Sequence, residues 1–178
     1  MGETLSMDLF CSGALAFLAS ELFRNFLILI GVVVAITSIV SNKTTARRKQ
    51  TADLLFGTRT DKALIEGYHR LRSLHDATDD NVRSYAQPEK RASDAANDIR
   101  YALNHWERIS VGICEGIYDE EMLRKTNYSN VIALFEHAEP FIKGVREVSG
   151  KATYYQDLEA MVKRWEARPL KLNKKRKP

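Results

Sequence analysis

The stretch from residue 104 to residue 123, NHWERISVGICEGIYDEEML, concentrates the side chains that could do chemistry. Glu107, Glu115 and Asp119 could serve as general acid, general base or metal ligands if the fold brought them together and partly removed them from water. His105 could assist them as a further proton carrier. One hypothesis is therefore an enzyme with a carboxylate-based site, with or without a bound metal.

A second interpretation of the same stretch is structural, and the spacing favours it. Gly116 follows the last apolar residues of a helical pattern, where a left-handed C-terminal cap is common. Asp119 can then cap the next helix, with two glutamates in its first turn. Gly112 leaves room for close approach of another segment. On this interpretation no catalytic residue is assigned, and the candidate interaction residues are Trp106, Glu107, Gly112, Glu115, Gly116 and Asp119.

Known catalytic and metal-binding motifs are not found in the sequence. The four histidines form no HExxH pattern, and there is no phosphate-binding GxxxxGK[ST], no GxGxxG and no GxSxG. No residue next to Cys114 in the sequence would activate it as a nucleophile, so we expect a small buried residue. The sequence therefore predicts no metal and no cofactor.

The N-terminal part contains a candidate membrane span. Residues 25–42 are eighteen consecutive residues without a charge. As a helix they would extend about 27 Å, close to the hydrocarbon thickness of a bilayer. A cleaved signal peptide is the main alternative, but the acidic residues before the stretch and the polar sequence after it do not fit one. We expect residues 1–24 to form an amphipathic, interfacial segment or a re-entrant hairpin before a retained transmembrane helix.

The excess positive charge lies in two short flanks. Residues 43–49 carry four basic residues and residues 168–178 carry six, whereas residues 50–167 carry 16 basic and 20 acidic side chains. By the positive-inside rule the N-terminus lies outside and the C-terminal domain in the cytoplasm, at a bacterial inner membrane. The flanks could bind anionic lipid headgroups or, less favoured, nucleic acid, through Arg47, Arg48, Lys49, Lys174, Lys175, Arg176 and Lys177.

The remainder of the chain predicts an all-α fold. Apolar residues recur at steps of three and four along four stretches, and no segment alternates as a strand would. We expect an antiparallel bundle of four to five helices over residues 43–167, followed by a basic tail. Pro88 suits the first turn of the second helix. Pro140 lies within the third stretch, where it should kink the helix or start a new one.

The stretch from Ile99 to Met122, IRYALNHWERISVGICEGIYDEEM, resembles a family of bacterial and prophage membrane proteins classed as domain of unknown function 4760. The resemblance lies in Trp106-Glu107, Val111-Gly112, Gly116-Ile117 and Asp119-Glu120, and in the order of span, helical linker, signature and aromatic-rich helix. It implies a bacterial or phage source and an inner-membrane location. It supplies no activity, and a link to phage–host conflict is an analogy.

These observations favour a membrane-anchored helical interaction protein, a scaffold or effector of bacterial or prophage origin. It would work through contacts with itself or with another protein, and phage exclusion or defence is a narrower version of the same hypothesis. The alternatives are the membrane-tethered carboxylate enzyme and a protein whose basic tail binds nucleic acid or anionic lipid.

Overall fold

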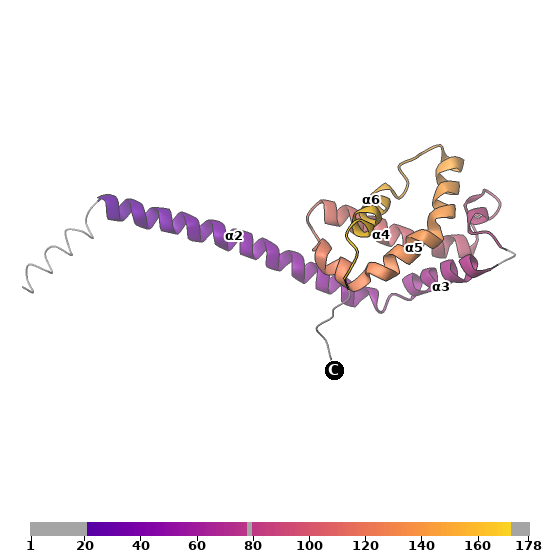
Figure 1. The fold of residues 1–178 in the computed structure, drawn as a ribbon, viewed down its shortest axis with the longest axis horizontal. Coiled ribbons are helices and arrows are strands. Elements are labelled where there is room, and N and C mark those ends of the chain that lie inside the picture. Colours follow the sequence, from indigo (N-terminus) through magenta and orange to yellow (C-terminus); the bar gives the residue numbers. More distant parts are fainter. Residues whose placement is uncertain (1–20, 78–79, 172–178) are drawn as a thin grey trace, which may run out of the picture. The chain divides into compact units, whose positions relative to one another are not determined.

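The computed structural model describes residues 21–77 and 80–171, and within these ranges every regular element is a helix. The prediction of an all-α fold is thus confirmed. In chain order the elements are α2 (Glu21–Thr58), α3 (Lys62–Asp76), the short 3₁₀ helix η1 (Val82–Ala86), α4 (Asp94–Cys114), α5 (Glu120–Ser149) and α6 (Gln156–Glu166) (Figure 1). Most of the predicted interfacial segment, and the tail residues Lys174, Lys175, Arg176 and Lys177, lie outside the described residues.

The chain divides into two compact units, residues 1–46 and residues 47–178. In the described part of the first unit, the apolar stretch is helical, has no buried residue, and is long and apolar enough to cross a membrane. Its Thr37 hydroxyl donates to the carbonyls of Val33 and Val34 in the same helix. A hydroxyl satisfied in this way adds no unpaired polar group to an apolar surface.

The second unit is the helical bundle, and local capping explains where its helices begin. The Asp61 carboxylate accepts the Leu64 N–H at the start of α3, and the Ser93 hydroxyl accepts the Ala96 N–H at the start of α4. Each side chain thereby satisfies one of the backbone donors that a helix leaves unpaired at its first turn.

The expectation for Pro88 is wrong, because α4 begins six residues later, at Asp94. Pro88 lies instead in the turn that follows η1. The residue before it, Gln87, has φ −74° and ψ 153°, the extended conformation that a following proline imposes. Ser93, by contrast, offers the side-chain acceptor that a helix start needs.

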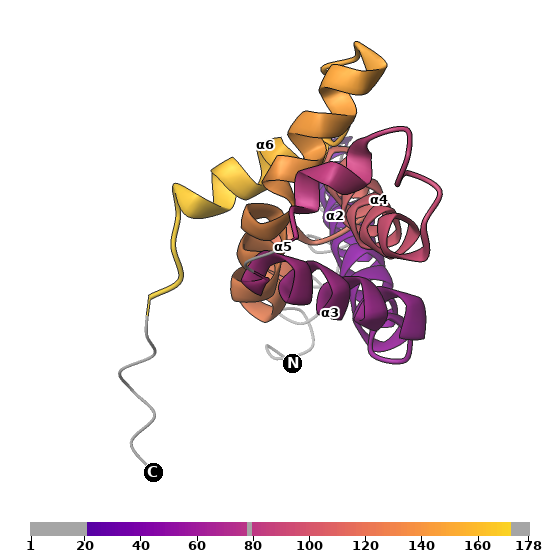
Figure 2. The ribbon, with the colours of Figure 1, turned by 90° about the vertical axis from the view of Figure 1, so that its right-hand side faces the viewer.

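The core of the bundle forms around α4. Helix α3 packs against α4 and α5, α6 packs against α4 and α5, and η1 packs on α5 (Figure 2). Apart from Thr51 of α2, the largest fully buried side chains come from α3, α4, α5 and α6, so the apolar core is shared by these four helices. They include Trp165, Phe141, Leu71, Ile99, Leu103, Leu123, Ile142, Leu158 and Met161.

Helix α5 runs unbroken from Glu120 to Ser149 with Pro140 inside it. Figure 1 shows that its lighter, C-terminal part turns away from the direction of its first part. Proline removes one backbone hydrogen bond and crowds the preceding turn, so it bends a helix. Of the two alternatives, the helix is therefore kinked and does not start anew. It ends at Gly150, a left-handed cap with φ 66°.

Candidate functional site

The corner between α4 and α5 is built as a helix stop followed by a helix start. Gly116 has φ 71°, a left-handed conformation that glycine adopts without strain. Its N–H donates to the Ile113 carbonyl at 3.0 Å, and the Ile117 N–H reaches back to the Gly112 carbonyl at 2.8 Å. These two bonds make a Schellman motif, so the predicted C-terminal cap is confirmed.

Asp119 begins α5, as predicted. Its carboxylate accepts the Met122 N–H at 3.0 Å, and Glu120 and Glu121 occupy the first turn. Glu120 also reaches α6, where its Oε1 accepts from the Trp165 indole N–H at 3.1 Å and from Arg164 at 3.2 Å. Asp119 and Glu120 therefore both have hydrogen-bond partners within the bundle.

The three carboxylates of the enzyme hypothesis do not converge. Glu107 accepts the Leu158 N–H at 2.8 Å, at the N-terminus of α6. Glu115 is exposed at the end of α4, while Asp119 caps α5. Burial raises the pKa of Glu107, and two backbone N–H bonds oppose that rise in part. The described residues thus show one carboxylate at each of three helix ends instead of one carboxylate pocket.

The other candidates in the segment pack inside the bundle. Trp106 is 3% exposed, and the ring of Tyr118 lies so close to Gly112 that an added Cβ would approach its Cε2 to 2.5 Å. The close approach at Gly112 is therefore made by an aromatic side chain. Cys114 contradicts its prediction, because it is exposed. It is the last residue of α4, where the buried face ends at Ile113.

Two arginines of the basic flank contact the corner between α4 and α5. An Arg47 guanidinium N–H donates to the Tyr118 carbonyl at 3.3 Å, and Arg48 lies 3.5 Å from the Asp119 carboxylate. Thr51, which is fully buried, accepts the Asp119 N–H at 2.8 Å. Sequence reasoning placed Arg47 and Arg48 on a lipid or nucleic-acid surface and missed Thr51, because no periodicity marks a single threonine in a polar flank. Lys49 is exposed.

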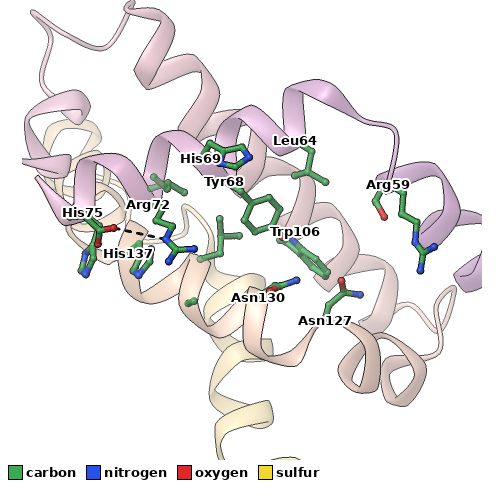
Figure 3. A pocket seen from close by; sticks show the side chains of 15 residues that line it. Arg59, Leu64, Tyr68, His69, Arg72, His75, Trp106, Asn127, Asn130 and His137 are labelled. Atoms are coloured by element: carbon green, nitrogen blue, oxygen red, sulfur yellow. Dashed lines mark hydrogen bonds and ion pairs between the residues drawn. The ribbon is translucent and has the colours of Figure 1, made fainter.

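A cleft of about 710 Å³ opens elsewhere in the bundle, between α3 and α5, with Trp106 of α4 among its lining residues. Figure 3 shows Arg59 at one end, Tyr68 and Trp106 in the middle, and the two imidazoles of His75 and His137 at the other end. No sequence pattern predicted this cleft, since its residues come from separate helices. Within the described residues, the lining consists of Thr58, Arg59, Leu64, Tyr68, His69, Leu71, Arg72, His75, Asp76, Trp106, Asn127, Asn130, Ala133, Leu134 and His137.

A hydrogen bond joins the two aromatic residues at the centre of the cleft. The Trp106 indole N–H donates to the Tyr68 hydroxyl at 2.5 Å. Burial raises the pKa of Tyr68 to about 12, although this hydrogen bond opposes the rise. The phenol therefore keeps its proton at neutral pH and remains a donor.

At the far end, the rings of His75 and His137 stack with their centroids 4.0 Å apart and their planes 13° apart. Burial lowers the pKa of His137, and the nearby His75 lowers it further, with Asp76 and Glu136 opposing. The pair joins residues 62 positions apart, so single-sequence reasoning treated each histidine as isolated. Within the described ranges, no group of three or more His, Cys, Asp or Glu side chains is arranged to hold a metal ion.

A model of the family described as "Domain of unknown function (DUF4760)" matches residues 25–165. The chain belongs to this family. The match confirms the resemblance noted in the sequence, and the DUF4760 region takes in both the apolar stretch of α2 and the bundle as far as Trp165 of α6. No curated protein and no solved structure shows significant similarity to the chain.

Proposed function

We propose that this DUF4760 protein is a membrane-anchored helical bundle that acts through contacts with other proteins or with copies of itself. The observation that carries the proposal is the exposure of residues 25–42. In the described structure none of this eighteen-residue apolar stretch is buried. So much exposed apolar surface is unfavourable in water and is stabilised in a bilayer.

The proposed location is a bacterial inner membrane, with the N-terminus outside and the bundle in the cytoplasm. Four basic residues directly after the stretch and one arginine before it support this orientation. The exposed Lys43 and Lys49 would face anionic headgroups, each contributing about 1 kcal/mol. Glu107, Glu115 and Asp119 share no site in the described structure, which is why interaction is proposed in place of catalysis.

Membrane insertion and orientation are tested with reporters fused to each end of the full chain. We expect a cytoplasmic reporter to be active at the C-terminus, an exported reporter to be active at the N-terminus, and the protein to stay in the membrane fraction after a carbonate wash. A variant with Leu29→Lys and Val33→Lys, one turn apart in the stretch, should lose insertion. Recovery of the wild-type chain in the soluble fraction would contradict the proposal.

The interaction itself is tested by cross-linking in native membranes. A photo-reactive residue placed in turn at exposed positions of the bundle should give a specific adduct with a second copy or with another protein. Val111 and Ile117 are suitable positions, because both apolar side chains are more than two-fifths exposed. A protein that remains monomeric and free of adducts at every position would contradict this part of the proposal.

Phage exclusion or defence is the narrower version of the proposed function. It rests on analogy alone, since the family resemblance implies a phage-related source without showing one. The test compares phage plating on bacteria that express the full chain with plating on bacteria that express the double-lysine variant. A drop in plating that requires the intact apolar stretch supports this narrower role, and equal plating across a broad phage panel counts against it.

A further inference from the structure

The cleft between α3 and α5 has the dimensions of a small-molecule site. Its volume of about 710 Å³ falls within the roughly 300–1,000 Å³ typical of ligand pockets. Leu64, Leu71 and Leu134 give it an apolar wall, and polar groups are distributed along its length. Pockets of this kind commonly combine an apolar body with a few polar groups that fix a ligand's orientation.

Positive charge dominates its lining. Arg59 lies at one end, and within the described residues no carboxylate lies at ion-pair distance from its guanidinium. Arg72 lies toward the other end, where Asp76 is 3.9 Å away and both side chains are largely exposed. In the described part of the chain, Asp76 is the one acidic residue among the lining residues. The Arg59 guanidinium also lies over the ring of Phe56, 6.0 Å from its centroid. A negatively charged ligand would therefore meet one guanidinium without a carboxylate partner among the described residues and one that is only loosely paired.

The centre of the cleft offers hydrogen-bond donors. Tyr68 accepts from the Trp106 indole N–H, so its own hydroxyl proton is available to a ligand acceptor. The high pKa of Tyr68 keeps that proton in place at neutral pH. Asn127 and Asn130, on the α5 side, add amides that can both donate and accept. Side-chain amides pair well with the edges of heterocyclic rings, which also alternate donors and acceptors.

We propose that this cleft binds a small organic anion of the mononucleotide class, with its phosphate at Arg59 and its planar ring between Tyr68 and the asparagines. The apolar wall removes the ring from water, and the amides bind its polar edge. The guanidinium of Arg59 binds the phosphate through charge-assisted hydrogen bonds. This site is independent of the membrane anchor and of any protein partner.

Binding is tested on the full chain in detergent micelles by isothermal titration with AMP, UMP, adenosine and inorganic phosphate. At least one mononucleotide should bind at least about tenfold more tightly than either adenosine or phosphate, because only the intact nucleotide engages both halves of the cleft. Phosphate binding as tight as AMP and UMP would overturn the assignment of the ring. The absence of binding by both mononucleotides would overturn the proposal as a whole.

Two pairs of variants locate the site. Arg59→Gln and Asn130→Ala change exposed side chains of the cleft, and Arg91→Gln and Asn104→Ala change exposed side chains outside its lining. We expect the first pair to weaken nucleotide binding by about tenfold each, within the range for loss of one charged or polar contact. The second pair should bind like the wild type, and helical content should be equal in all four. Equal losses in the cleft and control variants would overturn the proposed site.

Discussion

The carboxylate of Glu107, in the middle of α4, caps the N-terminus of α6 by accepting the Leu158 N–H at 2.8 Å. The Asp157 N–H points to the same carboxylate at 3.4 Å. Helix α6 needs this distant acceptor, because its own N-cap residue, Tyr155, is in a left-handed conformation and supplies no side-chain cap. A negative charge at this position also suits the helix dipole. Glu107, a candidate in the carboxylate-site hypothesis, thus stabilises the contact between two helices.

Replacing Glu107 by alanine should destabilise the bundle. The change leaves the first turn of α6 without an acceptor, and loss of an N-cap costs about 1–2 kcal/mol. The measurement is urea unfolding of the full chain in detergent, followed by far-UV circular dichroism. Glu115→Ala is the matched control, because Glu115 lies on the same helix but is exposed. Its effect should stay within about 0.5 kcal/mol. Equal effects of the two substitutions would contradict the capping role.

The same carboxylate should make stability depend on pH. Burial raises the pKa of Glu107 above the ordinary value of 4.5, so the folded state holds this proton more tightly than the unfolded state. The resulting stability is present below pH 4.5 and is lost as the pH rises through the raised pKa. Glu107→Gln cannot titrate. The unfolding free energy of the wild type, relative to this variant, should therefore increase as the pH falls toward 4.5. A difference that is constant with pH would contradict this assignment.

The hydrogen bond between Trp106 and Tyr68 should be important for stability. Tyr68→Phe keeps the ring but leaves the indole N–H of a nearly buried Trp106 without its acceptor. An unpaired buried donor costs about 1–3 kcal/mol. Tyr101→Phe is the matched control, since that hydroxyl donates to Asp61 at an exposed site, and it should cost at most about 0.5 kcal/mol. The measurement is again urea unfolding, and a loss for Tyr68→Phe no greater than for the control would contradict the prediction.

Features that depend on near neighbours in the chain were predictable from the sequence. Gly116 and Asp119 were assigned as caps because a helix end has a local signature of residue types. The apolar stretch and the bundle follow from composition and periodicity, which are also local. The prediction for Pro88 was wrong although it rested on the same kind of local signal. Both proline and serine are typical of helix starts, and the helix begins after Ser93 instead of at Pro88.

Features that join distant segments were not predictable. Glu107 with Leu158, His75 with His137, and Arg47 with Tyr118 are separated by 51, 62 and 71 residues, respectively. A single sequence does not indicate which helix faces pack together, so none of these three contacts could be predicted from it. The prediction that Cys114 is buried was wrong for a related reason. At the end of a helix, a shift of one position moves a residue from the buried face to the exposed one.

The stacked histidines should weaken the fold at mildly acidic pH. Burial, together with the charge of His75, lowers the pKa of His137 below its ordinary value of 6.5. The unfolded chain therefore binds the proton more readily, and the stability present above pH 6.5 is lost as the pH falls through the lowered pKa. Arg72 adds to this effect, whereas Asp76 and Glu136 oppose it.

The test compares unfolding free energies at about pH 7.5 and about pH 5.5, on either side of the ordinary histidine pKa. The wild type should lose stability between the two, and His137→Gln should lose less. A part of the loss should remain in that variant, because burial also lowers the pKa of His105. His69→Gln, at an exposed position, serves as the control and should keep the wild-type pH dependence. Equal pH dependence in the wild type and His137→Gln would contradict the prediction.

The crossing of α3 and α4 depends on Gly67, a residue that no sequence pattern singled out. An added Cβ would lie 2.7 Å from the Asp98 carbonyl oxygen and 2.9 Å from the Ala102 Cβ. Because a backbone carbonyl cannot move aside as a flexible side chain can, Gly67→Ala should force the two helices apart and cost about 1–3 kcal/mol.

Gly57→Ala is the matched control for this last prediction, since Gly57 is also helical and no atom would lie within 4 Å of its added Cβ. Alanine favours helix over glycine, so this variant should range from neutral to about 1 kcal/mol more stable. Thermal unfolding by circular dichroism measures both. If the two substitutions change stability in opposite directions, the close approach of α3 to α4 determines the effect of Gly67→Ala, and not the removal of a glycine as such. A Gly67→Ala variant as stable as the wild type would contradict the tight crossing.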